Sequence, residues 1–97
     1  MKIGVIKETQ KGEKRVAISP NISKLLIEKG FELLVEEDAG LASSYKNSDY
    51  ESAGAKIVSR ETLFNESTVL IKINPFDEDD LKLVNNTQIL MSQLYYK

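Results

Sequence analysis

Three side chains near the ends of apolar segments could face a binding cleft, and one of them could bind a small anion. Arg15 lies in the charged stretch that follows the first apolar segment, and its planar guanidinium suits a carboxylate or phosphate held through two parallel hydrogen bonds. Asn74 ends the most apolar segment of the chain, directly before Pro75. Each also has a plainer interpretation, since Arg15 could be an exposed loop charge and Asn74 could be part of a turn.

Lys72 interrupts the apolar run at residues 68–73, where strand alternation puts it on the same face as Leu70 and Asn74. A lysine in a buried strand is costly unless it is paired or reaches water. Lys72 could therefore be a cation at a binding cleft. It could also extend to the surface, or pair with an acid such as Glu8. Glu8 itself could orient Arg15 or be solvated.

The residue types exclude several kinds of site. The chain has no cysteine and no histidine, so it lacks thiolate chemistry, the commonest general base and the commonest metal ligand. Its five glycines never form a dinucleotide-binding or phosphate-loop spacing. The acidic run at residues 77–80 is typical of a helix start and not of a metal site. We therefore predict no catalytic, metal-binding or cofactor-binding residue within this segment.

Composition narrows the class of protein further. The 97 residues predict one small domain, and a net charge of −2, from 13 basic and 15 acidic residues, argues against nucleic-acid binding. No apolar run approaches the ~20 residues of a membrane span, and the N-terminus does not resemble a signal peptide. These features leave bacterial cytoplasm and organelle matrix as alternatives.

Five short apolar segments alternate with helix signals along the chain. Strands are predicted at residues 2–6, 31–35, 56–58, 68–73 and 88–94. Helices are predicted after Ser19-Pro20, at 49–53 behind a Ser48–Glu51 capping box, at 60–64 after Ser59, and from Asp77 to 83. The expected end caps are Gly30 and Gly54.

This alternation predicts an α/β fold: a Rossmann-like, three-layer parallel sheet with helices on both faces. A ligand should then lie beyond the carboxyl ends of the strands, where Arg15 follows the first strand. The chain ends at Tyr95-Tyr96-Lys97, directly after a predicted strand with no helix to cover it. We therefore expect an incomplete domain, the N-terminal fragment of a larger one.

The order of these motifs resembles a known family. The stretches KIGVIKE, EKRVAISP, EKGFELLVE, DAGLASSYKNSDYESAGAKIV and STVLIKINP together are similar to the N-terminal domain of the alanine dehydrogenase and pyridine nucleotide transhydrogenase family. The resemblance covers essentially all of residues 1–97. It implies the first part of a substrate-side domain that a later stretch completes, with an NAD-binding domain inserted between them and absent here.

The resemblance points to two branches that differ in their site residues. Alanine dehydrogenases hold the carboxylate of pyruvate with an arginine that Arg15 matches, but Asn74 stands where they have a lysine and Tyr95 where they have a histidine. An amide cannot donate a proton as a lysine does, and tyrosine is a poor base at neutral pH. The stretch Lys72-Ile73-Asn74-Pro75 is more similar to the transhydrogenase alpha subunit.

The transhydrogenase branch implies hydride transfer between NAD(H) and NADP(H), coupled to proton translocation. NAD(H) would be bound mainly by the missing domain and NADP(H) by a partner domain or subunit, so this segment alone should be inactive. The resemblance also implies a homodimer beside membrane domains, at the inner face of a membrane. The alternatives are an alanine dehydrogenase, with Lys72 replacing the missing lysine, and a non-catalytic binding or dimerisation module.

Overall fold

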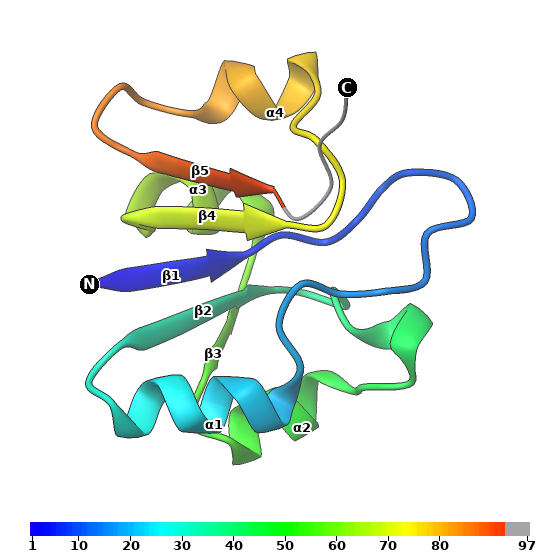
Figure 1. Cartoon of the computed structure of the whole chain (residues 1–97), viewed down its shortest axis with the longest axis vertical. Helices are drawn as coiled ribbons and strands as arrows, with labels where there is room; N and C mark the ends of the chain where they lie inside the picture. Colours follow the sequence, from blue (N-terminus) through cyan, green and yellow to red (C-terminus); the bar gives the residue numbers. More distant parts are fainter. Residues whose placement is uncertain (93–97) are drawn as a thin grey trace.

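The computed structural model describes residues 1–92 and contains a five-stranded parallel sheet in the order β3-β2-β1-β4-β5 (Figure 1). The strands are β1 (Lys2–Val5), β2 (Glu32–Glu36), β3 (Lys56–Val58), β4 (Val69–Lys72) and β5 (Ile89–Ser92). The parallel α/β sheet predicted from the sequence is confirmed. Residues 93 and 94 of the predicted last strand, and Tyr95, lie outside the described residues.

Helices lie on both faces of the sheet, as the sequence pattern predicts. On one face α1 (Pro20–Glu28) packs on β2 and α2 (Asn47–Ser52) packs on β3. On the other face α3 (Arg60–Glu66) contacts β1 and β2, and α4 (Glu78–Leu83) packs beside α3 (Figure 1). The winding reverses at β1, because β2 and β3 extend the sheet on one side and β4 and β5 on the other. Such a reversal opens a crevice at the carboxyl ends of the strands.

The helix starts follow their predicted caps in three of four cases. The Ser19 hydroxyl accepts a hydrogen bond from Ile22 N–H, Ser59 caps α3 and Asp77 caps α4. The exception is α2, which begins at Asn47 and not near residue 49. There the carboxylate of Asp49 accepts a hydrogen bond from Lys46 N–H at 2.8 Å, so Asp49 reaches back from the first turn and the predicted box at Ser48 does not form.

Two apolar clusters hold the layers together, one on each face of the sheet. The first joins Val5, Leu33 and Val35 to α1 and to the buried Tyr50 of α2. The second joins Ile6, Leu34 and Leu70 to Leu63 and Phe64 of α3, among others. Tyr50 is completely buried, and its hydroxyl donates to the carbonyl oxygen of Ile18 at 2.8 Å, which fixes the chain just before α1.

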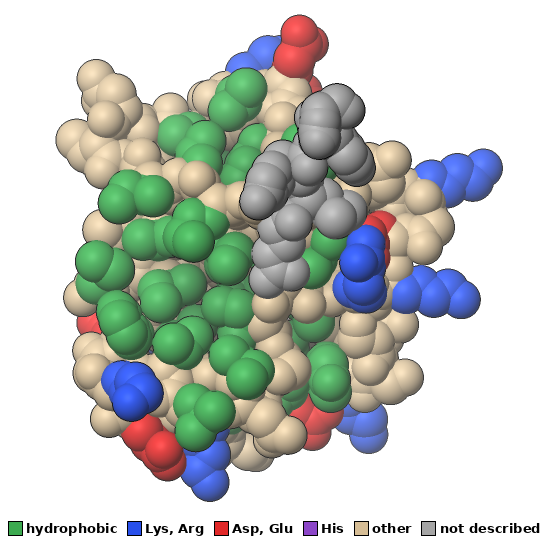
Figure 2. Space-filling model, viewed as in Figure 1, with side chains coloured by type: hydrophobic (Ala, Val, Ile, Leu, Met, Phe, Trp, Pro, Cys, Tyr) green, Lys and Arg blue, Asp and Glu red, His purple; other side chains and the backbone are tan. Residues whose placement is uncertain are grey.

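The face of the sheet that carries α1 is open over β4 and β5. Figure 2 shows hydrophobic side chains gathered across this face, between α1 and α4 of the same view. On β5, Ile89 and Met91 are 53% and 50% exposed, which is unusual for large apolar side chains of a parallel sheet. Among residues 1–92, no helix covers β4 and β5 on this face, whereas α3 and α4 lie on the opposite face of the sheet (Figure 1).

Candidate functional site

A polar cavity lies at the carboxyl edge of the sheet, where β1 and β2 end. It has a volume of about 180 Å³ and is lined by Lys7, Glu8, Glu13, Arg15, Asp38, Ala39, Leu41 and Ala42. Lys7 and Glu8 follow β1, Asp38 and Ala39 follow β2, and Leu41 and Ala42 belong to the short 3-10 helix η1 (Leu41–Ser43). This is the crevice expected where the winding of a parallel sheet reverses.

Arg15 reaches this cavity and pairs with Glu13. The Nε and Nη2 atoms of Arg15 donate to the two carboxylate oxygens of Glu13, each at 2.9 Å, and Arg15 N–H donates to Oε2 at 2.9 Å. A tight turn makes this possible, because Glu13 N–H donates to Gln10 C=O and Gly12 takes a φ of 85° that suits glycine. The guanidinium is thus fixed from one edge, while the Arg15 side chain is 62% exposed.

Asn74 lies on the opposite side of Glu13 and joins it to Glu8. The amide nitrogen of Asn74 donates to Glu13 Oε1 at 3.0 Å and to Glu8 Oε1 at 3.1 Å. Glu8 also accepts hydrogen bonds from the backbone N–H groups of Ile73 and Asn74. Glu8 therefore ties the end of β1 to the end of β4, and it does not orient Arg15 by a hydrogen bond.

These contacts change the acidity of Glu13. The hydrogen bonds from the side chain and then the backbone of Arg15 lower the pKa of Glu13 to about 2; Asn74 adds to the effect, while partial burial opposes it. The same pair raises the pKa of Arg15, first through the hydrogen bond and then through the charge of Glu13. Both groups are therefore fully charged at neutral pH.

Lys72 does not line this cavity. Its ammonium is buried, with the side chain 3% exposed, and Nζ donates to Asp80 Oδ2 at 3.1 Å. The pairing with an acid that strand burial demands is present, but the partner is Asp80 of α4 and not Glu8. The sequence predicts only a helix-start role for Asp80, and Asp80 has both roles, since Oδ2 also accepts a hydrogen bond from Asp77 N–H.

A network of buried charges continues from Asp80. Arg60 of α3 donates to the other oxygen of Asp80 and lies 3.5 Å from the carboxylate of Glu36, the last residue of β2. Glu36 accepts a hydrogen bond from Lys7 N–H at 2.9 Å, and burial raises its pKa. Burial also pushes the pKa of Asp80 upward, but hydrogen bonds from Asp77, Arg60 and Lys72 outweigh it and leave that pKa lowered.

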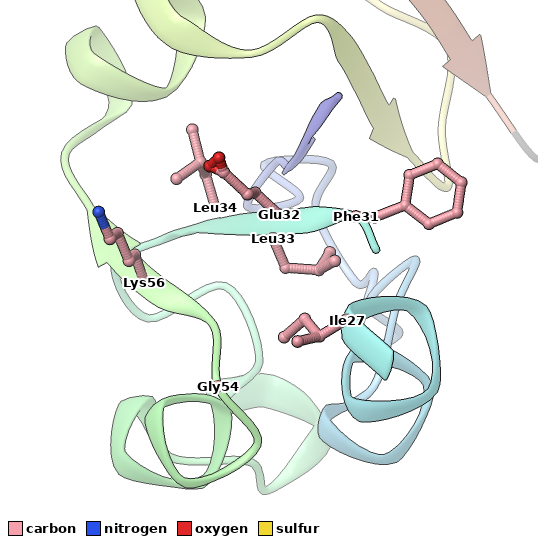
Figure 3. A pocket seen from close by; sticks show the side chains of 7 residues that line it. All are labelled: Ile27, Phe31, Glu32, Leu33, Leu34, Gly54 and Lys56. Carbon is pink, nitrogen blue, oxygen red and sulfur yellow. The ribbon is translucent and has the colours of Figure 1, made fainter. Parts of the chain in front are cut away.

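A second cavity, of about 110 Å³, opens at the other edge of the sheet and is lined by Ile27, Phe31, Glu32, Leu33, Leu34, Gly54 and Lys56. In Figure 3 the side chains of Ile27 and Leu33 point toward each other across it, while Phe31 points away. Its lining is mostly apolar, and its two charged residues come from the amino-terminal ends of β2 and β3. It lacks the converging polar groups that mark a binding site for a small polar ligand.

The structure thus brings together two of the three candidate residues. Arg15 and Asn74 meet through Glu13, which the sequence reasoning did not select, and Lys72 belongs to a separate buried network. The close spacing of Glu13 and Arg15 was the available signal for that pair. Among residues 1–92 no cluster of three or more acidic side chains could hold a metal ion, and no helix is long and apolar enough to cross a membrane.

Comparison with known proteins identifies the family. Residues 4–96 match the model for "Alanine dehydrogenase/PNT, N-terminal domain". The alanine dehydrogenase of Staphylococcus haemolyticus is 39% identical over 95 residues, covering 98% of this chain and 26% of the relative. Alanine dehydrogenase 1 of Staphylococcus aureus is 35% identical over the same length, with 25% of the relative covered.

Two solved structures share the fold over 95% of the chain. A transhydrogenase from Sinorhizobium meliloti superposes with a TM-score of 0.89 at 26% identity, with 27% of its chain covered. An L-alanine dehydrogenase superposes with the same TM-score at 30% identity, with 26% covered. The chain spans about a quarter of the length of these relatives, whose names are those of oxidoreductases. The protein belongs to the alanine dehydrogenase/PNT N-terminal domain family.

Proposed function

We propose that residues 1–97 form the N-terminal segment of a proton-translocating NAD(P) transhydrogenase alpha subunit. The carrying observation is Asn74, whose amide nitrogen contacts the carboxylates of Glu8 and Glu13 at the carboxyl end of β4. An amide donates hydrogen bonds but cannot release a proton at neutral pH, so this position cannot protonate a carbonyl as an ammonium group can. The solved transhydrogenase and the solved alanine dehydrogenase superpose with the same TM-score, so the fold fits both branches and the choice between them rests on Asn74.

In this proposal the hydride chemistry is supplied by nicotinamide cofactors. NAD(H) would bind mainly to a domain outside these residues, because this segment contains no glycine-rich phosphate cradle. NADP(H) would bind to a partner domain or subunit. The role of this domain is then to form one wall of the cleft and to exclude water from it. We also propose a homodimer that works with membrane domains, at the inner face of the membrane.

The test uses the full polypeptide encoded by the reading frame, together with its partner subunits. We expect NADPH to reduce an NAD analogue that absorbs at a separate wavelength, and we expect pyruvate and ammonium to cause no NADH oxidation. The N74A variant should retain most of the hydride transfer, because the amide is not asked to move a proton. Absence of transfer between the two nucleotides would overturn the proposal.

A second candidate is an alanine dehydrogenase. It is favoured by the names of the relatives that are 35–39% identical and by the exposed guanidinium of Arg15, which could take an oxo-acid carboxylate. Lys72 would have to replace the missing lysine, but its ammonium is buried against Asp80. Pyruvate-dependent and ammonium-dependent NADH oxidation that disappears in R15Q would establish this function instead.

A further inference from the structure

We propose that Glu36, the last residue of β2, is a positioning residue that sets the width of the crevice at the carboxyl ends of the strands. It does so by holding the backbone of Lys7, which lines the polar cavity. The inference rests on the proposed function, since it assigns the residue that shapes this domain's wall of the cleft. Part of its test is independent of any nucleotide.

The backbones of β1 and β2 separate directly after their last paired residues, Val5 and Val35. The N–H of Ile6 then donates to β4, and the next N–H, that of Lys7, is met by the side chain of Glu36, whose Oε1 accepts at 2.9 Å. Because a side-chain carboxylate stands in for a backbone carbonyl, the two backbones can part without leaving this donor unpaired. The polar cavity opens at this point.

The residue that follows Lys7 is tied to the other side of the crevice. The carboxylate of Glu8 accepts hydrogen bonds from the N–H groups of Ile73 and Asn74, just after β4. The peptide between Lys7 and Glu8 is thus held from β2 by Glu36 and from β4 by the donors that Glu8 binds. Loss of either tether would leave residues 7 and 8 free to shift in the cavity wall.

Glu36 is itself held from the face of the sheet that α3 covers. It is 8% exposed, and Nη1 of Arg60 lies 3.5 Å from its Oε1. The guanidinium of Arg60 also donates to Asp80, which binds the ammonium of Lys72 in β4, and it lies 4.9 Å from the ring centre of Phe64. Buried ion pairs therefore join the end of β2 to β4. They keep the acceptor for the Lys7 N–H in a defined place.

The rate of hydride transfer depends on how closely the cleft holds the two nicotinamide rings together. A displacement of about 1 Å can cost about 100-fold in rate, even when its cause lies away from the reacting atoms. In the proposed function NAD(H) is bound mainly by another domain, so a shift of this wall should weaken its binding little. Loss of the Glu36 tether should therefore lower kcat more than it changes KM.

The experiment compares E36D and E36Q in the full-length polypeptide with its partner subunits. E36D keeps the charge beside Arg60 but is one methylene too short for the Lys7 N–H, whereas E36Q keeps an oxygen at the right length without the charge. For transfer from NADPH to the NAD analogue, we expect E36D to lower kcat about tenfold and to change KM for the analogue less than about twofold. E36Q should lower kcat less than about threefold.

Amide hydrogen exchange at Lys7 and Ile73 of the same full-length protein follows the positioning without nucleotides. In E36D the Lys7 amide loses its acceptor, and the Ile73 amide is reached through Glu8 and the shared peptide. Both amides should therefore exchange about tenfold faster or more, whereas E36Q should leave both close to the unmodified protein. A role for Glu36 in overall stability alone would not single out these two amides.

Two controls separate positioning from stability. E37A changes the neighbouring glutamate, which is exposed, and Y50F removes a buried hydrogen bond in the apolar cluster on the other face of the sheet. Both should leave kcat almost unchanged, although Y50F lowers the urea midpoint. Circular dichroism would confirm that each variant is folded. E36N is also one methylene short, so it replaces E36D in the comparison with E36Q if E36D does not fold.

Each outcome bears on the proposal. An unchanged kcat in E36D would overturn it, as would a larger loss in E36Q than in E36D, because charge and not reach would then matter. An equal fall in Y50F would overturn it, since general destabilisation would explain both results. Faster exchange at Lys7 with Ile73 unchanged would also overturn it. If the unmodified protein transfers no hydride between nucleotides, the proposed function fails, and exchange at Lys7 and Ile73 still tests the positioning.

Discussion

At the scale of single residues, the buried ammonium of Lys72 makes the sharpest prediction. K72M leaves Asp80 with Arg60 as its remaining cation, and breaking one partner of a buried pair costs about 3–5 kcal/mol when no other cation remains. We expect a loss of about 2–3 kcal/mol, because Arg60 compensates in part. Amide hydrogen exchange of β4 and α4 in the purified protein measures it.

The matched control is K82M. Lys82 also pairs with an aspartate, Asp79 at 3.9 Å, but both side chains are more than three-quarters exposed. Such a pair contributes about 0–1 kcal/mol, so K82M should leave exchange almost unchanged. Equal effects of K72M and K82M would show that the buried network does not stabilise the fold.

Tyr50 gives a second prediction at this scale. Its hydroxyl is buried and donates to Ile18 C=O, so Y50F leaves a carbonyl without its donor and should cost about 1–2 kcal/mol in urea unfolding. Y45F is the control, because the Tyr45 ring packs edge-on to Tyr50 but its hydroxyl makes no hydrogen bond with the described residues. A loss of the same size in Y45F would show that removing a tyrosine hydroxyl lowers stability here without the hydrogen bond to Ile18, and would contradict the assignment.

The chemistry of single residues explains which contacts of the site could be predicted from the sequence and which could not. Arg15 could be selected because arginine has a defined preference for paired oxygens and stands after a strand. For Glu13 the two-residue spacing from Arg15 was a weak signal, since a loop glutamate is ordinarily solvated and the turn at Gly12 is what brings it onto Arg15. The partner of Lys72 could not be predicted either. Asp80 belongs to α4, and the position of α4 beside β4 depends on the whole connection between β4 and β5.

At the scale of elements, the strands and most helix starts could be predicted because their signals are local. Ser19-Pro20, Ser59 and Asp77 each cap a helix with their own side chain or ring. The start of α2 could not, since two serines, an asparagine and an aspartate compete there and tertiary contacts decide. Asn47 bonds back to Asp38, which pulls the helix start toward β2.

The contact between β1 and the end of α3 supplies a prediction for an element. A Cβ added at Gly4 would overlap Ser67 Oγ and lie 2.9 Å from Ser67 Cβ, so α3 would have to move away from the sheet. We expect G4A to cost about 1–3 kcal/mol in urea unfolding. S67G should restore part of that loss in G4A/S67G, because it removes both close atoms.

The hydroxyl of Ser67 sharpens this test. It is buried without a hydrogen-bond partner among the described residues, so S67A alone should be neutral or slightly stabilising. Destabilisation by S67A, or strictly additive effects of G4A and S67G, would mean that the close approach at Gly4 does not limit the packing of α3 on β1.

At the scale of the whole molecule, the charge network predicts how stability depends on pH. The pKa values of Asp80 and Glu13 are lowered by folding, so their contributions are complete above their unfolded values near 4 and decline as the pH falls toward the folded ones. Glu36 acts in the opposite sense, because its raised pKa means that protonation relieves its burial at mildly acid pH. Stability should therefore fall steeply only below about pH 4.

Urea unfolding midpoints between pH 6 and pH 2.5 measure this dependence, and D80N is the informative variant. It lacks the carboxylate that α4 needs, so it should be less stable at pH 6 and show a flatter decline below pH 4. A parallel decline in D80N and the unmodified protein would show that other carboxylates govern acid unfolding.

The open sheet face predicts the behaviour of the 97-residue polypeptide by itself. Because Ile89 and Met91 expose apolar surface on an edge strand, the polypeptide should self-associate at micromolar concentration in sedimentation velocity. I89K/M91K should shift it toward monomer, whereas L41K, at an equally exposed leucine on η1, should not. Association that persists in I89K/M91K would place the contact elsewhere.

The central position of β1 has a consequence for how the molecule is made. The first strand to leave the ribosome lies in the middle of the sheet, and one of its two neighbours, β4, begins only at Val69. Glu13 can meet Arg15 as soon as both are synthesised, but Asn74 and the backbone donors for Glu8 come some sixty residues later. During translation, then, the ion pair of Glu13 and Arg15 forms in an open loop, and the loop is fixed only when β4 joins the sheet. Because long-range parallel pairing of this kind is slow, we expect the docking of β4 to be the slow step of folding.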